Sequence, residues 1–305
     1  MGLMHILESQ QFDRGLISQL LSTADSFREH SDLEPLKHKI LATLFYEPST
    51  RTRLSFESAM LRLGGRVITT ENAKEFSSAV KGESLEDTAR IVSGYADCIV
   101  IRHYEEGAAK RAAAVSLVPI INAGDGRGQH PTQALLDLYT IQRESGHIDG
   151  IKIAMVGDLA CGRTVHSLSY LLGKFRDVQI TYVSPPNLGI KQEIKDYLSR
   201  HNVKFSEETE LGKVLPNADI IYMTRLQKER MSLEDYRNAK GKYVLDMQNL
   251  GLIQPKARIL HPLPHVDEIN FPVDVEQTDR RIAYFRQAQN GLYARMALLY
   301  NLLQR

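Results

Sequence analysis

The sequence has 305 residues, a length that suits two domains of ordinary size or one large α/β domain. Hydrophobic residues make up 43% of it and charged residues 25%, a composition that excludes an intrinsically disordered chain. The 38 Lys and Arg residues nearly balance the 37 Asp and Glu residues, so the net charge of +1 favours neither nucleic acid nor an anionic membrane as a partner.

Short β-rich runs alternate with helical patterns along the chain, and this alternation predicts an α/β fold with parallel sheets flanked by helices. The first set of predicted strands covers residues 40–45, 67–70, 98–101 and 119–121. An amphipathic helix is predicted over about 131–144 and a closing helix over 290–303. The second set of strands covers residues 151–156, 179–183, 203–205, 219–223, 243–246 and 259–260.

Ser145, Gly146 and His147 form a polar stretch between the two sets of strands, and such a stretch suits a hinge. We therefore predict two domains, residues 1–145 and residues 146–287. In open parallel sheets, ligands bind beyond the carboxyl ends of the strands, so the residues that directly follow each strand are the candidates for a functional site.

Residues 47–53, with the sequence Glu-Pro-Ser-Thr-Arg-Thr-Arg, follow the first predicted strand and open a helix whose Phe56, Met60 and Leu63 share one face. A helix start offers unpaired backbone N–H groups and the positive end of the helix dipole, and this one adds three hydroxyls and two guanidiniums. These features predict a phosphate site. The alternative is an ordinary helix cap beside surface arginines.

Two further candidates follow later strands of the first set. Arg102 comes after the third strand, and His130 comes after the fourth, at the start of the amphipathic helix. Each by itself is more often a solvated charge or a helix-start histidine. Together they could place a cation and an imidazole beside one carbonyl, an arrangement that stabilises negative charge developing on oxygen.

These motifs resemble those of a known family. Residues 45–53 resemble the carbamoyl-phosphate signature of the aspartate and ornithine carbamoyltransferases, and residues 130–133, His-Pro-Thr-Gln, resemble their second signature. Residues 223–230 and 261–264 look like the family's aspartate-binding segments, so the resemblance covers nearly the whole chain. It implies that a carboxyl-terminal helix, about 288–305, packs back on the first domain, and that carbamoyl phosphate is the donor substrate.

The resemblance also implies roles for individual residues around carbamoyl phosphate. The residues that would polarise its carbonyl, and so act in catalysis, are Thr52, Arg102 and His130. Those that would hold its phosphate are Ser49, Thr50, Arg51 and Thr52. Its carbamoyl amide would be held by Gln133 and by the backbone at Pro262 and Leu263. No cofactor is expected.

The residues that match the family's aspartate ligands are Arg163, Arg225 and Gln227. The stretch 73–82 is polar and, read alone, predicts a mobile surface loop. In the family, residues that match Ser77 and Lys81 reach into the active site of the adjacent subunit, where the lysine also meets aspartate. The resemblance therefore implies a homotrimer with active sites shared between subunits.

The acceptor substrate follows from charge. Ornithine carries a side-chain ammonium and would need an anionic pocket, whereas the second carboxylate of aspartate needs cations, which Arg163 and Arg225 would supply. The ornithine enzymes also have a cysteine where Pro262 follows His261. The expected activity is carbamoyl transfer to L-aspartate in pyrimidine biosynthesis. The alternatives are another amino-acid acceptor, such as ornithine, and a silent anion-binding scaffold. His265 stands where the aspartate enzymes lead us to expect an arginine.

Three other matches are interpreted as coincidences. Residues 157–164 read as a phosphate-binding loop with Arg in place of the required Lys, which argues against an ATPase. Residues 78–81 have the spacing of a penicillin-binding serine motif, but its companion motifs are absent from the sequence. His261 and His265 have the i, i+4 spacing of metal ligands, but Pro262 and Pro264 exclude the helix that would align them, so no metal is predicted.

Several features bear on location and partners. The longest apolar stretch, 112–121, is much shorter than the roughly 18 residues of a membrane span. The amino-terminal sequence lacks a signal-peptide pattern, and two cysteines suit a reducing compartment, so a cytoplasmic location is expected. Regulatory chains or a dihydroorotase are possible partners, but no motif in the sequence decides between them.

Overall fold

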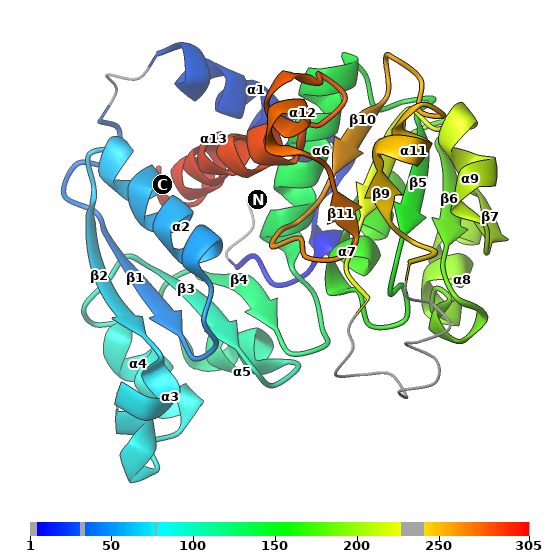
Figure 1. Ribbon diagram of the computed structural model, residues 1–305. Helices are drawn as coiled ribbons and strands as arrows, with labels where there is room; N and C mark the ends of the chain where they lie inside the picture. The colour runs from blue at the N-terminus through cyan, green and yellow to red at the C-terminus, as the bar shows by residue number, and fades with distance from the viewer. Residues whose placement is uncertain (1–4, 31–33, 77, 227–240, 305) are drawn as a thin grey trace. The chain divides into compact units, whose positions relative to one another are not determined.

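The computed structural model describes residues 5–30, 34–76, 78–226 and 241–304. The chain divides into two compact units, of which unit 1 comprises Met1–Leu136 with Gln289–Arg305, and unit 2 comprises Asp137–Ala288. Each unit is built on its own parallel β-sheet (Figure 1). The predicted α/β fold with two parallel sheets is therefore confirmed.

The sheet of unit 1 has four parallel strands in the order β2-β1-β3-β4. Their bounds are β1 (Ile40–Phe45), β2 (Arg66–Glu71), β3 (Cys98–His103) and β4 (Ile120–Asp125). The strand order reverses direction after β2, and right-handed crossovers then place the connections on opposite faces of the sheet. Figure 1 shows the helix after β1 on one face, and the helices before and after β3 on the other.

The helices of unit 1 begin directly after polar capping or loop segments. Their bounds are η1 (Ser9–Gln11), α1 (Arg14–Glu29), α2 (Thr50–Arg62), α3 (Ala73–Phe76), η2 (Ser78–Lys81), α4 (Leu85–Val92) and α5 (Ala108–Val115). The stretch 73–82 thus contains two short helical segments, α3 and η2, where the sequence predicted a loop. At four residues each, they are too short to show a helical periodicity.

Two long helices pass from one unit into the other, namely α6 (Pro131–Ser145) and α13 (Tyr284–Leu303). Within unit 1, α13 packs on α1, since the Phe27 and Tyr300 rings meet edge to face at 5.2 Å and Arg28 donates to Asn290 Oδ1 at 2.8 Å. The Arg295 guanidinium lies 5.0 Å from the Phe56 ring of α2. The expected packing of the carboxyl-terminal helix on the first domain is confirmed.

The main sheet of unit 2 has five parallel strands in the order β10-β8-β5-β6-β7. Their bounds are β5 (Lys152–Val156), β6 (Gln179–Val183), β7 (Lys204–Glu208), β8 (Ile220–Met223) and β10 (Arg258–Leu260). The predicted strand 243–246 is present only as β9 (Leu245–Asp246), which pairs with β11 (Ile269–Asn270) outside the main sheet. A two-residue strand carries too little pattern for its partner to be predicted.

The remaining helices of unit 2 cover both faces of its sheet. Their bounds are α7 (Arg163–Leu172), η3 (Pro186–Leu188), α8 (Gln192–Arg200), α9 (Leu211–Val214), η4 (Leu215–Asn217), α11 (Met247–Leu250) and α12 (Val273–Thr278). Leu211, Leu215 and Leu250 pack in one apolar cluster with Val156 and Ile221 of the sheet, so α9, η4 and α11 share a face. Right-handed crossovers place α7 and α8 on the opposite face.

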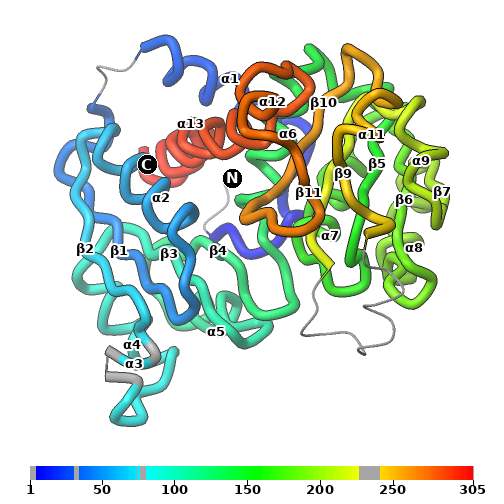
Figure 2. Tube along the Cα trace, viewed as in Figure 1, coloured from blue at the N-terminus to red at the C-terminus, as the bar shows by residue number. Residues whose placement is uncertain are grey.

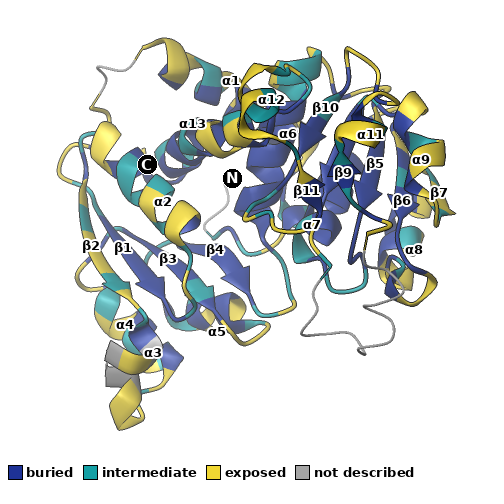
Figure 3. Cartoon of the chain, viewed as in Figure 1, coloured by how far each residue is buried: buried dark blue, intermediate teal, exposed yellow. Residues whose placement is uncertain are grey.

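The strands differ in burial, and two of the edge strands are the most exposed (Figure 3). All residues of β4 and β8 are buried, whereas the edge strands β2 and β7 expose residues along their length. The amino-terminal segment reaches the other edge of the first sheet, where Ile6 bridges to Ile121 of β4 (Figure 2). No helix in the part of the chain that the structure describes is both long enough and apolar enough to cross a membrane.

Candidate active site

The start of α2 forms the anion-binding feature that the sequence predicted. Ser49 is its N-cap residue, and within the described residues its side chain makes no capping hydrogen bond. The backbone N–H groups of the first helical turn can therefore donate to a bound anion, and the dipole of this 13-residue helix adds positive potential. Thr52 is buried, Ser49 is half-buried, and Thr50 and Arg51 are exposed.

Arg53 differs from the expectation, because its guanidinium serves the scaffold rather than the anion site. It donates to Glu71 Oε2 at 2.8 Å and lies 3.4 Å from Glu57 Oε1. Glu57 Oε1 also accepts hydrogen bonds from the hydroxyls of Thr43 at 2.9 Å and Thr69 at 2.7 Å. The second guanidinium of the motif is thus engaged with carboxylates that fasten α2 to β1 and β2.

Arg102 lies at the carboxyl end of β3 and connects the strands on either side of it. Its Nη2 lies 2.9 Å from Glu47 Oε2, in the segment after β1, and its Nη1 donates to the Ala123 carbonyl of β4 at 3.3 Å. The backbone N–H of Tyr46 donates to the Arg102 carbonyl at 2.9 Å. These contacts orient the half-buried guanidinium at the end of the sheet where ligands of such folds bind.

His130 caps the amino-terminal end of α6 and is buried. Its carbonyl accepts from the backbone N–H groups of Gln133 at 3.0 Å and Ala134 at 3.2 Å, and its Nδ1 lies 3.4 Å from the Thr132 hydroxyl. Gln133, one turn into the helix, is also buried. The imidazole and the Gln133 amide therefore lie on the first turn of one rigid helix.

The loop before His130 is fixed by Asp125, the last residue of β4. Asp125 Oδ1 accepts from the Gln129 backbone N–H at 3.1 Å and from Asn122 Nδ2 at 3.0 Å, while Oδ2 accepts from Gly107 N–H at 2.9 Å. Gly126 adopts φ +47°, and a Cβ there would lie 2.7 Å from two backbone atoms of the neighbouring loop. The path of the chain into His130 is therefore determined by contacts that are distant in sequence.

The three predicted catalytic residues of unit 1 follow neighbouring strands. Thr52 and His130 come after β1 and β4, and Arg102 lies at the carboxyl end of β3; these strands are adjacent and parallel in the sheet. Their hydroxyl, guanidinium and imidazole are thus carried by one edge of one sheet. Such a set can donate hydrogen bonds to an anion or to a carbonyl oxygen.

In unit 2, the predicted aspartate ligands also follow neighbouring strands. Arg163 is the first residue of α7, after β5, and Arg225 follows β8 by two residues. These strands are paired in the register Val156 with Met223. Arg163 is half-buried and Arg225 is exposed, so both cations lie at the carboxyl edge of the second sheet. Two cations that follow adjacent strands suit a ligand with two carboxylates.

A close approach of two chain segments fixes this edge. Gly157 adopts φ +122°, and a Cβ at this position would lie 2.2 Å from the Thr224 carbonyl oxygen. Thr224 donates to the Val156 carbonyl from its backbone N–H at 2.8 Å and from its hydroxyl at 2.9 Å. The residue before Arg225 is therefore held against the loop that leads to Arg163, and only glycine fits between them.

The His-Pro-Leu-Pro segment 261–264, the late motif of the sequence, follows β10, the strand on the other side of β8. The backbone N–H of His261 donates to Gln287 Oε1 at 2.8 Å, and that of Leu263 donates to His261 Nδ1 at 2.8 Å. Pro262 and Pro264 have no N–H. Every backbone donor of this four-residue segment is thus absent or already engaged, so its backbone offers a ligand carbonyl oxygens only. An acceptor-only backbone suits a ligand that carries an NH2 group.

The His261 ring is locked by this arrangement. Since its Nδ1 accepts a hydrogen bond, its Nε2 carries the proton, and this Nε2 lies 2.9 Å from Glu268 Oε1. Burial raises the pKa of Glu268, but hydrogen bonds from His261 and the backbone outweigh that effect and leave the pKa below its ordinary value. Sequence reasoning missed Glu268 and Gln287, because nothing in the local pattern connects them to a motif that begins at residue 261.

His265, the departure from the expected arginine, contacts a different set of groups. Its Nε2 lies 3.4 Å from Glu276 Oε1 of α12, and its ring centre lies 5.3 Å from that of Tyr284 in α13. The Tyr284 hydroxyl donates to the same Glu276 oxygen. The side chain that follows the late motif is therefore held by α12 and α13.

Two predicted site residues, Ser77 and Gln227, lie outside the described residues. Lys81 ends η2 and is exposed. Among the described residues, no three His, Cys, Asp or Glu side chains are grouped as a metal site would require.

The comparison with protein families matches these features. The chain matches the carbamoyl-P binding domain of aspartate/ornithine carbamoyltransferase over residues 4–143 and the Asp/Orn binding domain over residues 149–302. The chain therefore belongs to the aspartate/ornithine carbamoyltransferase family.

Within this family, the chain is similar to relatives named for the aspartate reaction. It is 57% identical over 304 residues to the chloroplastic aspartate carbamoyltransferase of Arabidopsis thaliana, a match that covers 98% of this chain and 77% of that relative. It is 49% identical over 305 residues to the aspartate carbamoyltransferase catalytic subunit of Methanocaldococcus jannaschii, covering 98% of both chains.

The fold is also similar to solved structures. Aspartate transcarbamoylase from Trypanosoma cruzi in complex with N-(phosphonacetyl)-L-aspartic acid matches with a TM-score of 0.92 and 39% identity, over 98% of this chain and 95% of that one. The catalytic subunit of the M. jannaschii aspartate transcarbamoylase matches with a TM-score of 0.90 and 49% identity over 98% of both chains.

Proposed function

We propose that the protein transfers the carbamoyl group of carbamoyl phosphate to the amine of L-aspartate, giving N-carbamoyl-L-aspartate and phosphate in pyrimidine biosynthesis. The observation that carries the proposal is the pair Arg163 and Arg225, which follow the adjacent strands β5 and β8, in a chain of a family that transfers carbamoyl groups to aspartate or ornithine. Two cations suit the two carboxylates of aspartate and would repel the side-chain ammonium of ornithine.

The start of α2 binds the phosphate of carbamoyl phosphate in this proposal. The backbone N–H groups of its first turn donate to the phosphate oxygens, as anions at helix starts are commonly bound. The residues that complete this phosphate site are Ser49, Thr50, Arg51 and Thr52, with Ser77 and Lys81 from the adjacent subunit.

The carbamoyl group is bound by two sets of groups of opposite polarity. Its carbonyl oxygen accepts hydrogen bonds from Thr52, Arg102 and His130. Its NH2 group donates to the Gln133 side-chain oxygen and to the carbonyls of Pro262 and Leu263, which the acceptor-only backbone of residues 261–264 supports. The buried Gln133 would select the NH2 end, since an amide oxygen can accept from it.

The reaction then proceeds by addition and elimination. The neutral amine of aspartate attacks the carbamoyl carbon, the carbonyl electron pair moves onto oxygen, and the C–O bond to phosphate breaks when that pair returns. Thr52, Arg102 and His130 stabilise the negative oxygen, and loss of one such donor typically costs roughly a hundredfold to a thousandfold in rate. The departing phosphate accepts the proton of the attacking amine, and His130 acts as a donor rather than as a base.

Aspartate is bound by Arg163, Arg225 and Gln227, with Lys81 of the adjacent subunit. Carbamoyl phosphate and aspartate are both anions and repel each other in water, so the cations of the two units must neutralise them before the amine and the carbamoyl carbon can be aligned. Alignment itself can supply several kcal/mol of the rate enhancement. We also propose residues 145 and 146 as the boundary between the domain that binds carbamoyl phosphate and the domain that binds aspartate.

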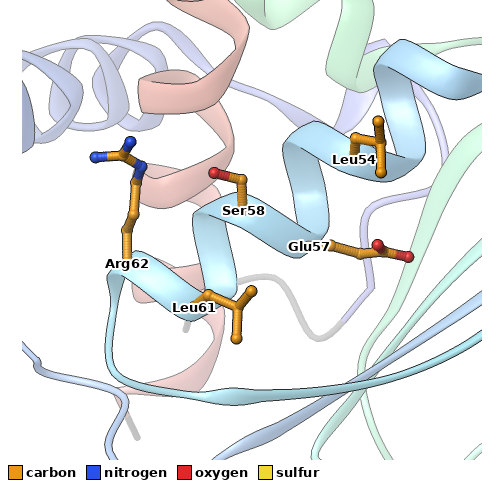
Figure 4. A pocket seen from close by; sticks show the side chains of 5 residues that line it. All are labelled: Leu54, Glu57, Ser58, Leu61 and Arg62. Atoms are coloured by element: carbon orange, nitrogen blue, oxygen red, sulfur yellow. The ribbon is translucent and has the colours of Figure 1, made fainter.

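The proposed assembly is a homotrimer that shares its active sites. Figure 4 shows the exposed side of α2, where an open pocket of about 550 Å³ is lined by Leu54, Glu57, Ser58, Leu61 and Arg62. Leu54 is 50% exposed and Leu61 is 60% exposed, and they recur at i and i+7 along one side of the helix. Exposed leucines on the helix that opens the phosphate site support burial of this face by another subunit. A cytoplasmic location completes the proposal, although the plant relatives are named as chloroplastic.

The test of the reaction is formation of a ureido product from carbamoyl phosphate by purified protein, with L-aspartate and L-ornithine supplied in parallel. Turnover with aspartate alone is expected, and Arg102→Ala should lower it by roughly a hundredfold or more. Turnover with ornithine alone would contradict the assignment of Arg163 and Arg225. No turnover with either acceptor would favour a scaffold that binds anions.

Site sharing can be tested by complementation between inactive trimers. At aspartate concentrations well below KM, Lys81→Ala and Arg163→Ala trimers should each be nearly inactive, because each lacks one cation at every site. After the two kinds of subunit exchange, some sites combine Lys81 from an Arg163→Ala subunit with Arg163 from a Lys81→Ala subunit, and activity should reappear. Confirmed exchange without recovery would mean that each site is built from one chain.

A further inference from the structure

A buried chain of hydrogen bonds connects the late motif to the middle of α6. The His261 backbone N–H donates to Gln287 Oε1 at 2.8 Å, and Gln287 Nε2 donates to Asp137 Oδ1 at 2.6 Å. The hydroxyl of Tyr222 donates to the other carboxylate oxygen, Asp137 Oδ2, at 2.7 Å. All four residues are almost completely buried, so water does not compete with these contacts.

The groups at both ends of this hydrogen-bond network determine which atom donates and which accepts in each bond. A backbone N–H can only donate, so Gln287 must turn its carbonyl oxygen to His261 and its NH2 group to Asp137. Burial raises the pKa of Tyr222, and the negative charge of Asp137 raises it further, so the tyrosine hydroxyl keeps its proton and donates. Asp137 therefore receives two donors and fixes the orientation of the Gln287 amide.

We propose that Gln287, oriented by Asp137, is a positioning residue that sets the carbonyls of Pro262 and Leu263 to recognise the NH2 group of the carbamoyl donor. The inference rests on the proposed function and goes beyond it by assigning donor selectivity to two residues that do not touch the substrate. Because Gln287 holds the backbone of His261, a shift of this amide moves the two carbonyls that follow. A phosphate bound at α2 would not be affected.

The sharpest test exchanges the polarity of the pair. In Gln287→Glu, one oxygen of the introduced carboxylate still accepts from His261, but the other faces the Asp137 carboxylate and repels it. The double variant Gln287→Glu/Asp137→Asn places an amide opposite this carboxylate, so that its NH2 group donates to position 287 and its oxygen accepts from Tyr222. The double variant contains one buried carboxylate, as the wild-type pair does, and restores the three hydrogen bonds described above.

The readout is selectivity between carbamoyl phosphate and acetyl phosphate, in which a methyl group replaces the NH2 group. Binding of each is measured by calorimetry without aspartate, beside inorganic phosphate and a thermal melt. Gln287→Glu should lower the preference for carbamoyl phosphate over acetyl phosphate by roughly three- to tenfold, the effect of one hydrogen bond, with phosphate binding unchanged within about twofold. The double variant should recover most of the preference.

Three results would overturn the inference. The preference could survive in Gln287→Glu, it could stay lost in a double variant that melts like wild type, or all three ligands could weaken equally, as a general loss of folding would cause. Because these are binding measurements, they are independent of the acceptor. Failure of the wild-type protein to carbamoylate aspartate would instead contradict the proposed function.

Discussion

Gly157→Ala should damage both the stability of unit 2 and the binding of aspartate. The added Cβ would lie 2.2 Å from the Thr224 carbonyl oxygen and 2.5 Å from its hydroxyl oxygen. The positive φ of +122° costs about 1–2 kcal/mol for a residue with a side chain, and relief of the overlap adds about 1–3 kcal/mol. We therefore expect the free energy of unfolding to fall by about 2–5 kcal/mol.

A control in the same unit separates the two contributions. Gly150 also has a positive φ, +78°, but nothing lies within 4 Å of the Cβ that alanine would add. Gly150→Ala should therefore show only the backbone cost. In a domain of this size, 1 kcal/mol shifts the melting temperature by roughly 2–4 °C, so Gly157→Ala should melt roughly 2–12 °C below Gly150→Ala.

The functional consequence follows from the position of Arg225. Relief of the overlap displaces Thr224, and Arg225 is the next residue in the chain. Misplacement by about 1 Å can cost a hundredfold in rate, so kcat/KM for aspartate should fall by roughly tenfold to a hundredfold. Carbamoyl phosphate binding, measured by calorimetry, should be unchanged. Equal melting temperatures for the two alanine variants, or unchanged aspartate kinetics in Gly157→Ala, would refute this reasoning.

Three further predictions concern other parts of the molecule. Arg163→Ala should raise KM for aspartate by roughly tenfold to a hundredfold, the effect of a charged hydrogen bond, while Arg200→Ala at the end of α8 should not; equal values would exclude Arg163 as a ligand. Leu61→Glu should convert the proposed homotrimer into smaller, inactive species in sedimentation velocity, and a trimer that stays intact would place the interface elsewhere. The lowered pKa of Glu268 means that its contribution to stability is present above its ordinary value of 4.5 and is lost as the pH falls through the lowered pKa. The melting temperature of Glu268→Gln should therefore fall less steeply at acid pH than that of the wild type. An equally steep fall would contradict this.

The sequence by itself predicted the elements that carry a local signal. Strands β1 and β6 have the predicted bounds, because each is a run of apolar and β-branched residues between polar segments. The rule that ligands bind after strands pointed to Arg102 and His130, and the motif around Ser49 pointed to the start of α2. These inferences need only the order of residues along one segment.

Other features depend on residues that are far apart in the sequence. The anion-site motif does not distinguish Arg53 from Arg51, because Glu71, the partner that engages Arg53 of α2, comes 18 residues later, at the end of β2. The requirement for glycine at position 157 comes from Thr224, and the orientation of the late motif comes from Gln287. These contacts form only when distant segments pack together, so they cannot be predicted from the residues of a single segment.

The difference between the features that the sequence predicted and those that it did not has a physical cause. Hydrophobic periodicity, turn chemistry and helix starts are properties of a few consecutive residues, and they determined the two sheets, the helix with the phosphate motif and the cations after the strands. Hydrogen-bond polarity in a buried network depends on which groups meet when the segments pack. Only the tertiary structure could therefore show that Asp137, an acidic residue between Leu136 and Leu138, accepts hydrogen bonds from Gln287 and Tyr222.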